Sequence, residues 1–91
     1  MKTHLISYDL DKPGQDYTGI IARLKELGAV KVLYSEWVLR HTASAAEIRD
    51  DLQRFIDASD MLLVVVLTGE AAWTKLMISD NAFKQSIGAA A

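Results

Sequence analysis

The residues best suited to catalysis or metal binding lie at the end of one short stretch, His4–Asp9, which reads His-Leu-Ile-Ser-Tyr-Asp. Its apolar residues favour a strand, and the proline and glycine a few residues later end it, so Asp9 stands at the strand's carboxyl end. Two copies of Asp9 that met at a twofold axis would hold one Mg²⁺ or Mn²⁺, with waters and a phosphate as the other ligands. Such a metal would activate a water for phosphodiester hydrolysis.

The same residues also have a structural interpretation, which the sequence leaves open. Asp9 would then be a turn residue that accepts hydrogen bonds from backbone amides around residues 10–12. Asp11 and Asp16 would either supplement a metal site or be solvated loop and helix-start residues. Ser35 would contact a phosphate or orient a water, or else satisfy the backbone at a bend. No histidine is close to Ser35 in sequence, so nothing indicates a hydrolase triad.

Aromatic and histidine side chains offer weaker signals. Tyr8, Tyr34 and Trp37 would form a stacking surface for unpaired bases, although aromatic residues on strands more often belong to a core or a dimer interface. His4 and His41 lack the third ligand that a zinc site needs, and we expect them to be core or surface residues.

Composition limits the function classes. The 91 residues make one domain, with 51% hydrophobic residues and a net charge of -2. That charge supplies no bulk attraction for phosphate, and scattered cations such as Lys2, Lys31 and Arg40 indicate a solvated rim. The absence of cysteine excludes disulfides and thiolate metal sites and favours a reducing cytoplasm. We see no signal peptide, and the longest apolar run, Met61–Leu67, is far shorter than the ~20 residues of a membrane span.

Hydrophobic periodicity and capping residues predict the elements that would position these side chains. The helix near residue 44 has the strongest signal, because Ser44 and Glu47 match a capping box. The predicted elements are a strand at 2–8, a helix from 15 or 16 to 27, strands at 29–33 and 37–41 that are separate or form one bent element, a helix from 44 to 58 or 59, a strand at 61–67, and a short helix at 82–87 after a cap at 79–81.

This order predicts an α+β domain, a ferredoxin-like βαββαβ sandwich over about 2–67 with a C-terminal appendage over about 68–91. Two helices would cover one face of an antiparallel sheet and leave the other bare. The run Met61–Leu67 is apolar at every position, which predicts a strand covered on both faces. We therefore expect a second copy on the bare face, which makes the protein a homodimer.

Two segments resemble a known family. Leu5–Asp9 is similar to a first strand that ends in Tyr-Asp, and Tyr34–Val38 is similar to a segment in which a serine precedes an aromatic residue and a valine. Together with the capped second helix and the apolar last strand, they make residues 3–67 resemble the CRISPR-associated Cas-two family and its VapD-like relatives.

The resemblance implies a ferredoxin-like homodimer. Some members are magnesium-dependent nucleases, and others are structural adaptors. Asp9 would then be the catalytic residue and ligand of Mg or Mn, and Tyr8 and Ser35 would contact nucleic acid. The family's first helix commonly opens with basic residues, whereas 15–18 reads Gln-Asp-Tyr-Thr. We therefore expect a stand-alone relative and carry two hypotheses: a metal-dependent endonuclease acting on RNA or DNA, and a non-catalytic dimeric module that binds protein or nucleic acid. A small-ligand regulatory dimer is a third, without a supporting motif.

Overall fold

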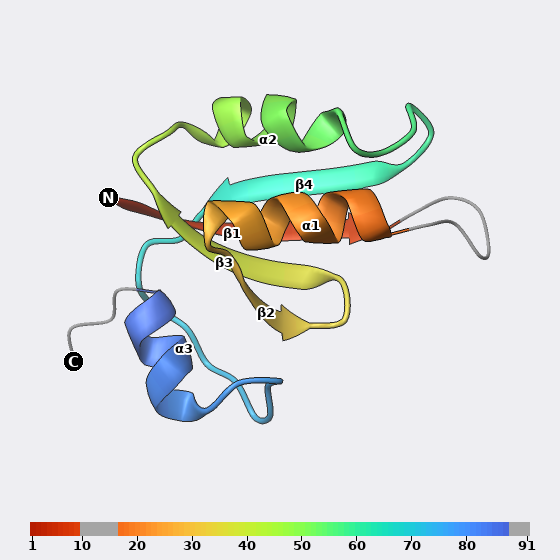
Figure 1. Ribbon diagram of the computed structural model, residues 1–91. Coiled ribbons are helices and arrows are strands. Elements are labelled where there is room, and N and C mark those ends of the chain that lie inside the picture. Colours follow the sequence, from red (N-terminus) through yellow and green to blue (C-terminus); the bar gives the residue numbers. More distant parts are fainter. Residues whose placement is uncertain (10–16, 88–91) are drawn as a thin grey trace.

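A four-stranded antiparallel sheet forms the centre of the protein, and helices pack on both of its faces (Figure 1). This computed structural model describes residues 1–9 and 17–87. The elements are β1 (Lys2–Asp9), α1 (Thr18–Leu27), β2 (Val30–Leu33), β3 (Glu36–His41), α2 (Ala45–Gln53), β4 (Met61–Val66) and α3 (Asp80–Ser86).

The strand order across the sheet is β2-β3-β1-β4, and every neighbouring pair is antiparallel. β1 is therefore an inner strand, while β2 and β4 are the two edges. This arrangement confirms the predicted α+β class and is compatible with a ferredoxin-like fold. The strands at 30–33 and 36–41 are separate, joined by a turn at Tyr34 and Ser35, so the alternative of one long bent element is wrong. A register shift between Lys31 and Leu33 adjusts the pairing ahead of that turn.

The main core lies between the sheet and the first two helices, on what we call the helix face of the sheet. Alternate residues of β1 and β3 point into it, as the period of two in a strand requires. α1 and α2 each present one apolar stripe to these residues. Its buried members are Ile6, Tyr8, Ile20, Leu24, Trp37, Leu39, Ile48 and Leu52.

Local signals explain where the helices begin and end. The capping box of α2 is present: the Ser44 hydroxyl accepts from the Glu47 amide at 3.1 Å, and the Glu47 carboxylate accepts from the Ser44 amide at 2.9 Å. α2 ends at Gln53, earlier than predicted, because the amides that follow, of Arg54 and Phe55, bond to carbonyls three residues back and tighten the chain into a turn. α1 ends at Gly28, whose φ of 89° is left-handed. The predicted start of α1 at residues 15 or 16 lies outside the described residues, and its N-cap is Tyr17.

We call the opposite surface of the sheet the far face. It is partly covered, whereas the sequence predicted that it would be bare. The chain after β4 returns to it and ends in α3, which lies on the other side of β2 and β3 from α2 in Figure 1. Phe83 and Ile87 pack there against Val32 and Val38. The segment is also tied by its backbone, since the Met77 amide donates to the Val32 carbonyl at 3.0 Å. The chain's own C-terminal segment therefore covers the β2–β3 half of the far face.

β4 contradicts the expectation of a strand covered on both faces. None of its six residues is fully buried, and Met61 and Leu63 are 64% and 55% exposed on the far face. The reason is the position of β4 at the edge of the sheet, beyond the part that α3 covers. Within the described chain, the strand with the most apolar sequence thus has one face in contact with solvent.

Candidate functional site

Asp9 lies at the carboxyl end of β1, on the far face of the sheet. It is exposed and stands directly opposite Met61 of β4 in the antiparallel register. A shallow cavity of about 180 Å³ at this place is lined by Ser7, Asp9, Met61 and Leu63 from the far face and by the adjoining Tyr8 and Leu62. Asp9 is thus at the border of the exposed apolar half of that face, which consists of Met61 and Leu63.

Tyr8 points the opposite way, into the helix face. It is 4% exposed, and its hydroxyl oxygen accepts a hydrogen bond of 3.1 Å from the indole Nε1 of Trp37. Burial raises the pKa of the Tyr8 phenol, so the group stays neutral. Adjacent residues of a strand project to opposite faces. Tyr8, the predicted nucleic-acid contact, and Asp9, the predicted catalytic residue and metal ligand, therefore lie on opposite faces of the sheet.

Ser35 is brought to Tyr8 by the β2–β3 turn. The Tyr8 amide donates to the Ser35 carbonyl at 3.1 Å, which fixes the turn beside the end of β1. The two predicted nucleic-acid residues consequently line the same cavity, of about 290 Å³, on the helix side of the sheet. We call it the tyrosine cavity. Its lining residues are Tyr8, Tyr17, Ile21, Lys31, Tyr34 and Ser35.

Three residues that line this cavity, Tyr17, Ile21 and Lys31, have no binding role in the sequence analysis. Tyr17 is 36% exposed, and its ring lies 5.7 Å from that of Tyr8, centroid to centroid. Lys31 was assigned to a solvated rim, but its ammonium lies 5.5 Å from the centroid of the Tyr34 ring, within the range of a cation–π contact. Trp37, predicted as a stacking residue or a core residue, is a core residue at 2% exposure. The residues of the tyrosine cavity come from β1, α1, β2 and the turn after β2, so their proximity is visible only in the tertiary structure.

His4 is a core residue, as expected, but an unusual one. It is fully buried, and neither ring nitrogen makes a hydrogen bond of good geometry within the described residues. Burial lowers the pKa of His4, and the nearby backbone of Ala43 and His41 offsets part of that effect. His41 accepts a hydrogen bond at Nδ1 from the Ala43 amide at 2.9 Å. The two histidines are neighbours, but across residues 1–9 and 17–87 no group of three potential metal ligands includes them.

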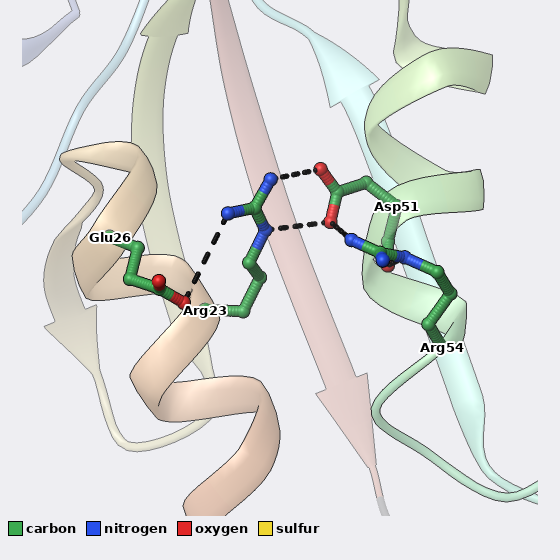
Figure 2. Close-up of polar contacts among 4 residues, drawn as sticks. All are labelled: Arg23, Glu26, Asp51 and Arg54. Atoms are coloured by element: carbon green, nitrogen blue, oxygen red, sulfur yellow. Dashed lines mark hydrogen bonds and ion pairs between the residues drawn. The ribbon is translucent and has the colours of Figure 1, made fainter.

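The strongest charge contact joins α1 to α2 (Figure 2). Arg23 donates from Nε and a terminal nitrogen to both carboxylate oxygens of Asp51, at 2.8 and 2.7 Å, and Arg54 donates to the same carboxylate at 2.9 Å. These hydrogen bonds, with Arg23 as the main partner, lower the pKa of Asp51 to about 2. The cluster holds the two helices together over the sheet and so supports the tyrosine cavity, which α1 helps to form.

The metal hypothesis requires further oxygen ligands beside the Asp9 carboxylate. The predicted supplementary ligands Asp11 and Asp16 lie outside the described residues. Within the described ranges, no set of three histidine, aspartate or glutamate side chains is arranged to hold a metal ion.

Comparisons with known proteins do not identify a family. No protein-family model matches the chain, and no solved structure matches it. None of the helices in the described part of the chain is both long enough and apolar enough to cross a membrane.

Proposed function

We propose that this protein is a Cas-two-like homodimer, with a ferredoxin-like βαββαβ core and a C-terminal appendage, that cleaves RNA or DNA with a divalent cation held between two Asp9 residues. The observation that carries the proposal is the position of Asp9. Its exposed carboxylate borders the exposed pair Met61 and Leu63. A second copy that covered this pair around a twofold axis near Asp9 would place its own Asp9 next to the first.

The apolar pair supplies a reason for dimerisation. Met61 and Leu63 expose more than half of their surface, and each side chain contributes roughly 1.5–3 kcal/mol on full burial. Two Asp9 carboxylates brought together would repel each other, which weakens the dimer unless a cation lies between them. The dimer should therefore be stabler with Mg²⁺ or Mn²⁺ than with a chelator. A cation bound there would supply an activated water for phosphodiester hydrolysis.

The experiment is a cleavage assay with labelled single-stranded RNA and duplex DNA in Mn²⁺, Mg²⁺ or chelator. Asp9→Asn removes a ligand charge with little change in size, and Glu70→Gln, in an exposed turn, is the matched control. Removing a residue that only orients a metal ligand costs about 10- to 100-fold in activity. Asp9→Asn removes a ligand itself, so its cleavage rate should fall by more than that. Equal cleavage by wild type and Asp9→Asn would refute the catalytic role of Asp9.

The dimer is tested separately by light scattering at micromolar concentration. Wild type should give twice the 10.1 kDa chain mass, and Leu63→Lys should give the monomer mass because it places a charge in the proposed interface. A wild type that stays monomeric with and without the cation would refute the shared site.

A non-catalytic dimeric module that binds protein or nucleic acid is the second candidate. The observation that favours it is the tyrosine cavity, which lies on the helix side of the sheet whereas Asp9 lies on the far face. Binding in the cavity does not require a metal at Asp9. Nucleic-acid binding by wild type without metal-dependent cleavage would select this candidate.

A further inference from the structure

The tyrosine cavity has a composition that the rest of the chain does not share. Among the described residues that line it, three are tyrosines, one is lysine and none is acidic, although the whole chain carries a net charge of -2. Aromatic side chains of a small domain normally fill its core, because each buries a large apolar area. Tyr34 is instead 84% exposed at the tip of the β2–β3 turn. The cavity therefore combines stacking surfaces with one positive charge.

The floor of the cavity is held in place. Tyr8 is fixed by the hydrogen bond from Trp37 in the core. The ring of Tyr17 packs against the ring of Tyr8 with an angle of 41° between the ring planes. Since the Tyr8 oxygen accepts that bond, its own proton stays available as a donor. Tyr34 and Lys31 form the exposed side, where a ligand would enter.

We propose that the tyrosine cavity binds one unpaired base of a single-stranded nucleic acid, with Lys31 against a neighbouring phosphate. This inference rests on the proposed action on nucleic acid and identifies where the strand is held. Aromatic faces and a single cation are the groups with which proteins bind unpaired strands without reading their sequence. Tyr8 and Ser35 also line the cavity, and Ser35 carries a hydroxyl that can donate or accept a hydrogen bond.

The size of the cavity sets how much of the strand it takes. At about 290 Å³ it is at the small end of ligand sites, which span roughly 300–1,000 Å³. It therefore suits one base, with the sugar and phosphate at the rim beside Lys31. A base within a duplex is stacked and paired and cannot enter without being extruded. The cavity should consequently distinguish single strands from duplexes.

The test is fluorescence anisotropy in a chelator, so that cleavage does not consume the probe. The probes are labelled RNA and DNA single strands of about eight nucleotides and the same strands annealed to their complements. Tyr34→Ala should weaken single-strand binding about 5- to 150-fold, the range for loss of one stacking platform, and Tyr34→Phe should retain it. The matched control is Leu33→Ala, because Leu33 is a neighbouring exposed apolar residue that does not line the cavity.

Lys31 is tested through salt. Lys31→Met should lower the slope of log affinity against log salt by about 0.7, the value for one phosphate contact on a single strand. Lys84→Met is its control, because Lys84 is an exposed lysine of α3 on the far face. A slope that Lys31→Met leaves unchanged would overturn the assigned phosphate contact.

The possible results separate this inference from the proposed catalysis. Weaker binding by Tyr34→Ala supports the cavity as the base site even if no cleavage depends on Asp9. Equal binding by wild type and Tyr34→Ala overturns the cavity site, even if Asp9-dependent cleavage is present. Equal affinity for single strands and duplexes also overturns it. Absence of any binding by wild type overturns the cavity site, whereas the cleavage assay with Mn²⁺ or Mg²⁺ decides separately whether the protein acts on nucleic acid.

Discussion

Replacing Asp51 with asparagine should destabilise the protein at neutral pH and have little effect in strong acid. Asp51 accepts two hydrogen bonds from Arg23 of α1 and one from Arg54, and its side chain is 22% exposed (Figure 2). Asparagine keeps the shape but removes the charge. The Arg23 guanidinium would then face an amide where it now has a bidentate carboxylate partner.

The magnitude follows from the pKa of Asp51. In the folded protein it is about 2, against an ordinary value of 3.8. That difference of about 1.8 pH units corresponds to at most about 2.4 kcal/mol, at 1.36 kcal/mol per unit. Water screens part of this energy, because Asp51 is 22% and Arg54 62% exposed. We therefore expect Asp51→Asn to lower the free energy of unfolding by about 1–2 kcal/mol at pH 7.

The sign of the pH dependence is fixed by the direction of the change. Because the folded-state pKa lies below the unfolded-state value, the contribution is fully present above about pH 3.8 and is lost as pH falls toward 2. Urea unfolding of wild type and Asp51→Asn at pH 7, 4 and 2 measures it. Asp50→Asn is the matched control, because Asp50 is 64% exposed and pairs only with Arg49 in the described chain. A difference between wild type and Asp51→Asn that persists unchanged at pH 2 would refute the electrostatic account.

Two further predictions concern the core on either face of the sheet. Burial lowers the pKa of His4 below the ordinary histidine pKa of 6.5. The buried neutral ring therefore contributes stability above pH 6.5, and this contribution is lost as pH falls through the lower folded-state pKa. His4→Leu should therefore flatten the decline in melting temperature between pH 8 and 5. The neighbouring Lys2 and His41 are unchanged in this variant. Parallel curves of melting temperature against pH for the two proteins would contradict the prediction. On the far face, Phe83→Ala removes a ring that is 8% exposed and lies edge-on to Trp73 at 4.6 Å between centroids. It should cost about 3 kcal/mol in urea unfolding, against little change for the exposed Lys84→Ala, and a loss below about 1 kcal/mol would show that α3 adds little to stability.

Much of the secondary structure was predictable from local sequence, because local chemistry decides it. The capping box at Ser44 and Glu47 and the exit at Gly28 depend on residues a few positions apart. The end of α2 was less predictable, because its hydrogen bonds tighten to a spacing of three over residues 54–56, where no glycine or proline marks the change. Alternation along β1 also implied that Tyr8 and Asp9 face opposite ways, an implication that the family motif obscured.

The sequence by itself determined the α+β class and the position of Asp9 at a strand end, since hydrophobic period and capping act within one element. The tertiary structure alone decided which surfaces these elements share. It placed α3 against Val32 and Val38 and left β4 at an exposed edge, because long-range packing selects among apolar partners of similar hydrophobicity. It likewise joined Arg23 to Asp51, and brought Tyr17, Tyr34 and Lys31 around Tyr8, groupings that no spacing along the chain encodes.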